Sequence, residues 1–346
     1  MIDPGPYLEK YSFIPIVTGP TASGKSAIAL ELCRMTGGEL ISADSMQIYR
    51  GLDIGTAKDS PEELAEIRHH MTDIIDPGES FSVYDYAKMA GECITDILSR
   101  GKLPVVCGGT GQYISALLYG INYGVEDDAA VRDAEDYFYS VLEKEGRDSL
   151  YAILTDTDPE AAELIHPNNV RRVVRALAVG KATGVRFSEK NRKSKLGGPS
   201  FNFKAFMPDM DRAVIYDRIN RRVDIMMQQG LEQEARSLYE NGKAKGTTCF
   251  QAIGYKEFEK YFSGEEDLEQ TAYKIKLGSR HYAKRQLTWF RQMGEDIRPV
   301  PSDDIKKAAG YILSSCKIED VIVDIGVPDA FLQNRRQIIH IDKIKP

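Results

Sequence analysis

The sequence predicts an α/β fold: a parallel sheet core of the P-loop NTPase-like type, flanked by helices and interrupted by a helical insertion domain. Over about the first 120 residues, short apolar runs alternate with helical patterns, as in βαβ units. A glycine-rich phosphate-loop motif lies between the first apolar run and the first helical pattern. After residue 124 the pattern becomes helical. We therefore expect a catalytic core at residues 1–124 and 206–315, an insertion at 125–205, and a C-terminal extension of unassigned role at 316–346.

Three strands and two helices are predicted in the first part of the core. The strands are expected at residues 13–18, 39–43 and 103–107, and the helices at 26–35 and 83–98. The phosphate loop follows the first strand, an aspartate follows the second, and a Gly-Gly-Thr-Gly turn follows the third. In a parallel sheet these turns meet at the carboxyl edge, where ligands bind. The sequence therefore directs all three turns to one crevice.

The later elements are predicted from periodicity and capping signals. The insertion is expected to be helical throughout, with a helix start at residues 156–158 before Pro159. Residues 193–200 are rich in glycine and lysine and lack periodicity, which predicts a mobile loop. Two long helices, at 215–238 and 273–293, are expected to return to the core, and residues 321–325 are strand-like.

The composition is that of an ordinary globular chain. Of the 346 residues, 42% are hydrophobic and 28% charged, which excludes a disordered or small disulfide-stapled protein. No apolar run approaches the roughly 20 residues of a membrane span, and the first residues lack a secretory-signal pattern. Five widely spaced cysteines predict reduced thiols. We expect a cytoplasmic protein without a membrane segment. The irregular spacing of His69, His70, His166 and His281 predicts surface or capping roles and no zinc site.

Charge is segregated along the chain, although the net charge is −7. Residues 121–165 hold 13 acidic and 3 basic side chains, whereas residues 166–195 hold 9 basic and 1 acidic. Residues 270–291 hold 6 basic side chains and no acidic one. This pattern is expected of a protein that grips a polyanion with particular faces. For any one segment alone, a solvated helix face is the competing interpretation.

Residues 19–26 fit the phosphate-loop pattern G-x-x-x-x-G-K-[ST], with the required strand before and helix after. Its backbone N–H groups and the helix N-terminus are suited to phosphate oxygens, the lysine adds a positive charge, and the serine hydroxyl offers a ligand for Mg²⁺. The motif predicts a phosphorylated ligand without specifying ATP. The diphosphate-binding residues are therefore expected to be Gly19, Pro20, Thr21, Ala22, Ser23, Gly24, Lys25 and Ser26.

The aspartate expected near this loop follows a different strand from the one that carries it in a typical nucleotide hydrolase. In such enzymes a buried strand ends in an aspartate that holds the metal. Here the strand at 103–107 runs into glycine, and the aspartate, Asp44, follows the second strand instead. Asp44 could act as a base towards a bound hydroxyl or amine, or lie behind the Mg²⁺ ligands. Capping of the next turn is the simpler alternative.

Further motifs continue in order along the chain. They are SADSMQIY at residues 42–49, DIGTAK at 53–58, GGTGQY at 108–113, HPNN at 166–169, IGY at 253–255 and KRQLTWFR at 284–291. Together with the phosphate loop they closely resemble the tRNA dimethylallyltransferase (isopentenyltransferase) family, over about residues 13–300. The combination is more specific than any single motif.

The resemblance implies a reaction. The family transfers a dimethylallyl group from dimethylallyl diphosphate to the exocyclic amine of the adenosine 3′ to the anticodon in tRNA, and releases diphosphate. It implies Asp44 as general base, with Thr110 and Arg222 as further catalytic groups. Arg218, one helical turn before Arg222, is the second candidate for holding the diphosphate. Mg²⁺ is the expected cofactor, bound at Ser26.

The partners implied are the anticodon stem-loop of tRNA and dimethylallyl diphosphate, and the enzyme is expected to be a monomer. The tRNA contacts are expected at Asp44, Ser45, Met46, Gln47, Thr110, Arg132, Arg171, Arg172, Arg175, Gln251, Gly254, Lys256, Arg280 and Lys284. A helical projection places four basic side chains of residues 270–291 on one stripe: Lys276, Arg280, Lys284 and Arg291. The core on the same helix is expected to take Ile275, Tyr282 and Phe290, and Trp289 is also predicted to be a core residue.

Three other functions fit parts of the pattern. A P-loop kinase for nucleosides or small molecules would use Asp44 to activate a hydroxyl and the insertion as a lid. A prenyltransferase for free adenine nucleotides would not need the basic insertion. A non-catalytic RNA-binding protein would not need Lys25, Ser26 and Asp44 in this arrangement.

Overall fold

A computed structural model describes residues 11–121, 128–194, 197–240 and 247–316. The chain divides into two compact units, one of residues 1–81, 89–114 and 201–346, the other of residues 82–88 and 115–200. Several sequence-based expectations lie outside the described residues: the strand-like residues 321–325, the C-terminal extension beyond Cys316, the basic Lys195, and the predicted domain junction near 124.

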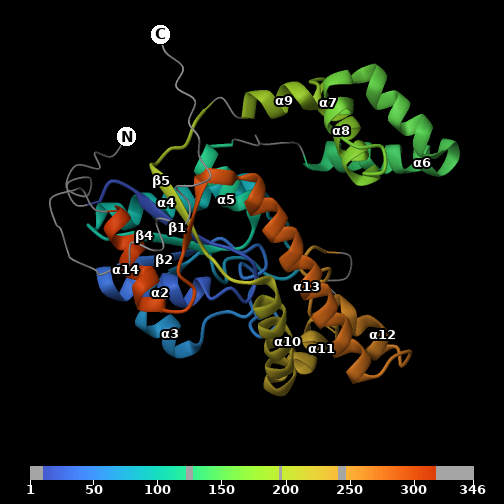
Figure 1. The fold of residues 1–346 in the computed structure, drawn as a ribbon. Coiled ribbons are helices and arrows are strands. Elements are labelled where there is room, and N and C mark those ends of the chain that lie inside the picture. The colour runs from blue at the N-terminus through green and yellow to red at the C-terminus, as the bar shows by residue number, and fades with distance from the viewer. Residues whose placement is uncertain (1–10, 122–127, 195–196, 241–246, 317–346) are drawn as a thin grey trace, which may run out of the picture. The chain divides into compact units, whose positions relative to one another are not determined.

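The first unit is built on one six-stranded parallel sheet in the order β3-β2-β4-β1-β5-β6 (Figure 1). The strands are β1 (Ile14–Thr18), β2 (Glu39–Ser42), β3 (His69–His70), β4 (Pro104–Gly108), β5 (Phe203–Pro208) and β6 (Ile297–Val300). Every residue of β1, β2 and β4 is buried, as expected where helices cover both faces of a parallel sheet. The predicted α/β class is confirmed.

Three of the six strands were not predicted. β3 has only two residues, both histidine, and carries no apolar run. β6 contains a proline, which is tolerated because this strand lies at the edge of the sheet. β5 begins at Phe203, so the expectation of helix up to residue 205 was wrong: this segment pairs with β1, and Ile16 lies opposite Ala205. These three strands form because they pair with strands distant in the sequence, and the local residue pattern did not reveal them.

The helices largely follow the predicted order. Those of the first unit are α2 (Lys25–Thr36), α3 (Pro61–Glu66), α10 (Arg212–Gln229), α11 (Leu231–Glu240), α12 (Glu259–Phe262), α13 (Leu268–Gln292) and α14 (Ile305–Cys316). Two others, α4 (Val83–Ser99) and α5 (Gly111–Tyr119), have residues in both units. Side chains of α2 and α14 share one core cluster with β1 and β4. None of the helices in the described ranges has the length and apolar character needed to cross a bilayer.

Two predicted helix boundaries were wrong. The single helix expected at 215–238 is two helices, because Gly230 adopts φ 102° and ends α10, donating its N–H to the carbonyls of Met226 and Met227. The helix expected from residue 273 begins five residues earlier, at Leu268. There Asp267 and Gln270 form a capping box, each side chain accepting the other's backbone N–H.

The second unit is helical and has its own core. Its helices are α6 (Asp128–Thr157), interrupted at Gly146, then α7 (Pro159–Leu164), α8 (Val170–Thr183) and α9 (Phe187–Ser194). The predicted helix start is confirmed, because the Asp158 side chain caps α7 through the N–H of Ala161. The same carboxylate accepts both the N–H and the hydroxyl of Ser188, which ties α9 to α7. α9 extends to Ser194, so the loop predicted from residue 193 begins later.

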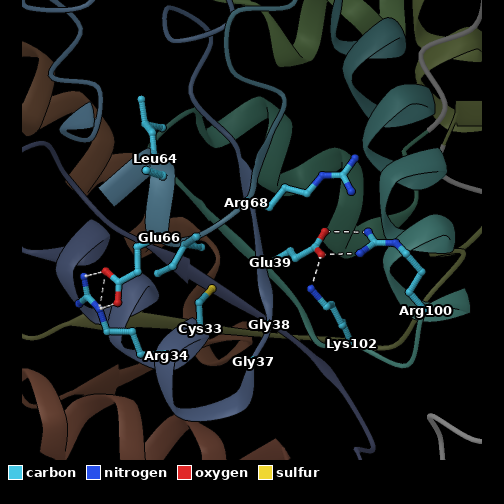
Figure 2. Close-up of a pocket in the computed structure, with 12 residues that line it drawn as sticks. Cys33, Arg34, Gly37, Gly38, Glu39, Leu64, Glu66, Arg68, Arg100 and Lys102 are labelled. Atoms are coloured by element: carbon cyan, nitrogen blue, oxygen red, sulfur yellow. Dashed lines mark hydrogen bonds and ion pairs between the residues drawn. The ribbon is translucent and has the colours of Figure 1, made fainter. Parts of the chain in front are cut away.

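A buried charge cluster organises the amino end of β2. The Glu39 carboxylate, 2% exposed, accepts hydrogen bonds from Arg100, from Lys102 at 2.8 Å and from His70 at 2.8 Å. Figure 2 shows Arg100 and Lys102 converging on Glu39 beside a pocket of about 620 Å³. This pocket lies at the amino edge of the sheet, opposite the phosphate loop. The hydrogen bonds from Arg100 hold the pKa of Glu39 far below its usual value.

The two adjacent histidines of β3 are neither surface nor capping residues, contrary to prediction. Their side chains are 6% and 10% exposed, and each is hydrogen-bonded to a carboxylate: His69 to Asp59 and His70 to Glu39. The two histidines of this short strand reach different carboxylates because successive side chains of a strand point to opposite faces of the sheet. In the described part of the chain, no group of three or more His, Cys, Asp or Glu side chains could hold a metal ion.

Replacing Glu39 by Gln is expected to lower the free energy of unfolding by about 1–3 kcal/mol, because the buried side chain loses charge-assisted hydrogen bonds from the more exposed Arg100 and Lys102. Since the folded-state pKa of Glu39 is depressed, its contribution is complete above its ordinary pKa of 4.5 and is lost as the pH falls below it. Denaturant unfolding between pH 3 and 7 (roughly the relevant window) checks both points. A variant that keeps the wild-type stability and acid sensitivity would contradict this account of the cluster.

Candidate functional site

The phosphate loop joins β1 to α2 in a conformation that requires its glycines. Gly19 has φ 140°, and a Cβ there would lie 3.1 Å from the Met207 side chain. Gly24 has φ 86° and precedes α2, whose N-terminus has no side-chain cap. The first N–H groups of α2 are therefore presented to a ligand, together with the positive end of the helix dipole.

Two side chains of the phosphate loop lack close hydrogen-bond partners among the described residues. The Ser23 hydroxyl has no hydrogen-bond partner within the described residues, although Ser23 is only 1% exposed. Lys25 makes one long contact, from Nζ to the Pro20 carbonyl at 3.4 Å. Burial lowers the pKa of Lys25, opposed by the nearby Cys107 and Asp44. A buried hydroxyl and a desolvated ammonium without close partners fit a phosphate ligand that would satisfy both.

Asp44 follows β2 and faces the loop. Its Oδ1 accepts the N–H of Met46 at 2.9 Å, so the turn-capping role considered from the sequence is present. No hydrogen bond to its Oδ2 is found among the described residues. Asp44 is close enough to Lys25 that its charge opposes the lowering of the Lys25 pKa by burial. One oxygen therefore fixes the carboxylate while the other is left for a substrate.

Thr110 is held beside Asp44 by a tight contact between the ends of β2 and β4. The Thr110 N–H donates to the Ala43 carbonyl at 3.1 Å, and the Ser45 N–H donates to Thr110 Oγ1 at 2.9 Å. A Cβ at Gly108 would lie 2.2 Å from the Ala43 oxygen, so only glycine allows this approach. The two turns after these strands thus act as one unit.

Helix α13 supplies a polar side chain that the sequence analysis missed. The Gln286 amide accepts the Thr21 N–H at 2.9 Å and donates to the Gly109 carbonyl at 2.8 Å. It is 5% exposed and joins the phosphate loop to the turn after β4. A signal was present, because Gln286 is a polar residue between Ala283 and Phe290 on the buried face of this helix.

Tyr282 and Trp289 on the same helix were both assigned to the core, and the structure contradicts this for Trp289. Tyr282 places its phenol at Thr110 and Gln286, and burial, followed by the charge of Asp44, raises its pKa. Trp289 is 39% exposed, and its ring lies so close to Gly111 that a Cβ there would be 2.5 Å from it. Ile275 and Phe290 are buried as predicted.

Helix α10 brings two arginines to the loop. Ile215 and Ile219 of α10 pack with Ala22 of the loop and Ala283 of α13, which sets the helix against the site. Arg218 Nη1 lies 3.7 Å from the position of a Cβ on Gly24. Arg222 is an exposed residue. Desolvation by the surrounding protein nevertheless lowers the pKa of its guanidinium, and the negative charge of Asp59 opposes this shift. It also acts on the pKa of Lys25, so these two cations lie near each other.

Other predicted site residues have structural partners of their own. The Gln47 amide accepts the Ser42 hydroxyl and donates to the carbonyls of Thr56 and Ala57. Arg280 donates to Asn220, and Lys276 pairs with Asp224 at 2.5 Å, so half of the predicted basic stripe is bound to α10. Lys284 is exposed.

Two of the sequence motifs are joined through Glu234 of α11. Its carboxylate accepts the N–H groups of Asp53, Ile54 and Gly55 and the hydroxyl of Tyr255. Residues 53–58 and 253–255 therefore form one hydrogen-bonded assembly. Gly254 is buried within it, whereas Gln251 and Lys256 are exposed beside it.

The basic residues of the second unit are only partly free. Arg175 pairs with Glu135 at 3.2 Å, and Lys193 pairs with Glu189 at 2.7 Å. Arg171 and Arg172 at the start of α8 are exposed, as is Arg132 on α6, and no ion pair of Arg171 or Arg172 is found among the described residues. These two arginines are the ones best suited to an external polyanion.

The chemistry of the first unit follows from these positions. Loop N–H groups, Lys25 and the two α10 arginines form a cradle for a multiply charged anion. Asp44, fixed by one oxygen, provides a base within the electrostatic range of that cradle. Ser26, beside Lys25 at the start of α2, is placed where a metal bound to the anion could be held.

Comparison with known proteins agrees with this arrangement. The family model for IPP transferase matches residues 47–293, and that for isopentenyl transferase matches residues 13–74. A curated tRNA dimethylallyltransferase of Bacillus cytotoxicus is 45% identical over 278 residues, covering 80% of this chain and 87% of that protein. The one from Bacillus subtilis is 42% identical over 313 residues, covering 88% and 98%.

Solved structures of transferases acting on tRNA are also similar to this chain. A tRNA delta(2)-isopentenylpyrophosphate transferase from Staphylococcus epidermidis superposes with a TM-score of 0.63 at 38% identity, covering 88% of this chain and 98% of that one. A eukaryotic dimethylallyltransferase acting on tRNA gives a TM-score of 0.74 at 27% identity, covering 93% and 83%.

Replacing Gln286 by Ala is expected to lower the free energy of unfolding by about 1–3 kcal/mol, because the Thr21 N–H and the Gly109 carbonyl lose their partner. With the loop no longer tied to its neighbour, affinity for inorganic diphosphate should fall about 10-fold, or ~1.4 kcal/mol. Calorimetric titration with inorganic diphosphate measures this affinity. The control is Gln292→Ala, an exposed residue of the same helix. Equal affinities for the two variants would refute the bridging role.

Proposed function

The chain belongs to the IPP transferase family, and we propose that it transfers a dimethylallyl group from dimethylallyl diphosphate to the exocyclic amine of the adenosine 3′ to the anticodon in tRNA. It is a prenyltransferase acting on tRNA, in keeping with its curated relatives. The single observation that carries the detailed proposal is the position of Asp44 against the phosphate loop within one compact unit.

The cationic side of the site would hold the diphosphate. As the allylic carbon loosens, negative charge accumulates on the departing diphosphate, and fixed donors stabilise it. The loop N–H groups, Lys25, Arg218 and Arg222 are placed for this. Mg²⁺ held by Ser26 would add positive charge to the leaving group when bound. The unpartnered Ser23 hydroxyl supports a phosphate ligand here.

The acidic side would activate the acceptor. An adenine exocyclic amine is a poor nucleophile because its lone pair is delocalised into the ring. A carboxylate within hydrogen-bond reach can take the proton as the new C–N bond forms. The Met46 N–H orients the Asp44 carboxylate through Oδ1, and Thr110 stands beside it through the joined turns of β2 and β4.

Exposed cations would bind the RNA. An adenosine stacked in an anticodon loop must be flipped out at a cost of a few kcal/mol, and phosphate contacts offset that cost. We assign this role to Arg171 and Arg172 of the second unit, together with Lys256 and Lys284 of the first, all exposed.

The test is incubation with dimethylallyl diphosphate, Mg²⁺ and unmodified tRNA. Wild type should prenylate the RNA, and Asp44→Ala should lower kcat about 10²- to 10⁴-fold because the base is gone, while tRNA affinity changes less than about 2-fold. Asp44→Asn, which keeps an acceptor for the Met46 N–H, should lose the same rate. Turnover of ATP without prenyl transfer would refute the function. Equal loss of rate and binding, confined to the Ala variant, would make Asp44 purely structural.

Replacing Arg171 and Arg172 together by Ala is expected to weaken tRNA binding about equally for all tRNA sequences. The slope of log K against log salt should shrink by about one unit for each arginine–phosphate ion pair that the substitutions remove. Filter binding from 50 to 200 mM salt (roughly the informative range) measures the slope. Lys193→Ala, whose ammonium is already paired with Glu189, is the matched control. An unchanged slope in the double variant would remove this helix from the RNA interface.

A further inference from the structure

We propose that Glu234 of α11 is a positioning residue for the acidic side of the site: it holds the segment 53–57, and that segment fixes the turn at residues 44–47. The inference rests on the proposed function, in which Asp44 takes the proton of the acceptor amine. Glu234 was not among the residues singled out from the sequence, and the resemblance assigned it no role.

The Glu234 carboxylate fills a nest of backbone N–H groups. Its Oε2 accepts the N–H of Asp53 and that of Ile54, both at 2.8 Å. Its Oε1 accepts the N–H of Gly55 at 2.9 Å. Successive N–H groups that converge in this way form a concave site for an anion. Here a carboxylate 180 residues after Ile54 occupies it, so the start of the segment is anchored to a remote helix.

Tyr255 completes this anchor. Its hydroxyl donates to Glu234 Oε1 at 2.7 Å, and a Cβ on Gly55 would lie 2.6 Å from its ring. Burial, followed by the charge of Glu234, raises the pKa of this phenol, so it keeps the proton that it donates. Because the ring leaves no room for a side chain at residue 55, the segment is held by packing as well as by hydrogen bonds.

The anchored segment reaches the Asp44 turn through Gln47. The Gln47 amide nitrogen donates to the carbonyls of Thr56 at 3.3 Å and Ala57 at 3.2 Å. Its Oε1 accepts the Ser42 hydroxyl at 2.9 Å. Ser42 precedes Asp44 and Gln47 follows it, so the amide ties the two ends of the turn together. The position of Asp44 therefore depends on where the two carbonyls of the segment hold this amide.

The segment needs support from outside because its backbone is strained. Ala57 has φ 51°, a left-handed conformation that costs free energy in a residue other than glycine and persists where neighbouring contacts over-determine it. The Ala57 N–H donates to the Ile54 carbonyl, and the Lys58 N–H to the Asp53 carbonyl, each at 3.0 Å. These bonds start from two residues that Glu234 holds. Loss of its carboxylate is therefore expected to shift the carbonyls on which the amide depends.

The phosphate loop is held independently of this segment. Among the described residues no hydrogen bond joins residues 53–58 to residues 19–26, and the loop is tied instead to Gln286 through the Thr21 N–H. A defect at Glu234 should therefore lower the rate of transfer and leave diphosphate bound as before.

The test is prenyl transfer to tRNA, together with calorimetric titration of inorganic diphosphate in Mg²⁺. Glu234→Gln keeps the shape of the side chain, but whichever way its amide faces, at least one backbone N–H of the segment loses its acceptor. We expect kcat to fall about 10- to 100-fold, because a displaced base loses its alignment, and the Kd for diphosphate to change less than about 2-fold. Glu232→Gln, which removes a carboxylate of the same helix that pairs with Arg236, should behave as wild type.

Each result decides the matter. A loss of kcat with an equal loss of diphosphate affinity, or of diphosphate-binding sites per protein, would show a general structural role. That result, or an unchanged kcat, overturns the proposal. If Glu234→Gln does not fold, Glu234→Asp keeps the charge on a shorter side chain and is judged by the same comparison. Wild-type protein that does not prenylate tRNA would instead contradict the proposed function, so the two failures are distinguishable.

Discussion

The close approach of the β4 end to the β2 end is the contact on which the site depends. Gly108 lies against the Ala43 backbone where no side chain fits, and the Thr110 N–H closes the gap by donating to Ala43. Because the strands are parallel and adjacent, their following turns emerge together at one edge. The residue that could act as base and the turn that supports it are therefore fixed by sheet pairing and not by loop flexibility.

The helices that complete the site come from far along the chain. α10 and α13 pack against the phosphate loop through a small apolar cluster that includes Ala22 and Ala283. That packing delivers the Arg218 guanidinium and the Gln286 amide to a loop that precedes them by 194 and 265 residues respectively. The amide bridge also explains why Gly109 must lack a side chain, since a Cβ would meet its nitrogen at 2.3 Å.

The edge strand β3 links two charge systems. Its first histidine is hydrogen-bonded to Asp59, and its second completes the cluster around the buried Glu39 carboxylate at the amino end of β2. A strand of only two residues would be a weak edge by backbone bonds alone. The two carboxylate partners fix it in place, so side-chain hydrogen bonds supplement the short backbone pairing at this sheet edge.

Local pattern determined the phosphate loop, the three central strands and the capped helix start at Asp158, because each depends on neighbours within a few residues. The family followed instead from the ordered combination of motifs along the chain. Local pattern did not give β3, β5 and β6, which carry weak apolar signals and exist by pairing with distant strands. It also misassigned Trp289 and the two β3 histidines, because a side chain's burial and partners are set by elements remote in sequence. The sequence by itself thus determined the fold class and proposed Asp44 and the phosphate loop as the reacting groups. Only the tertiary structure decided that Gln286 joins the phosphate loop to the turn after β4, because a polar side chain acquires its role from what packs against it.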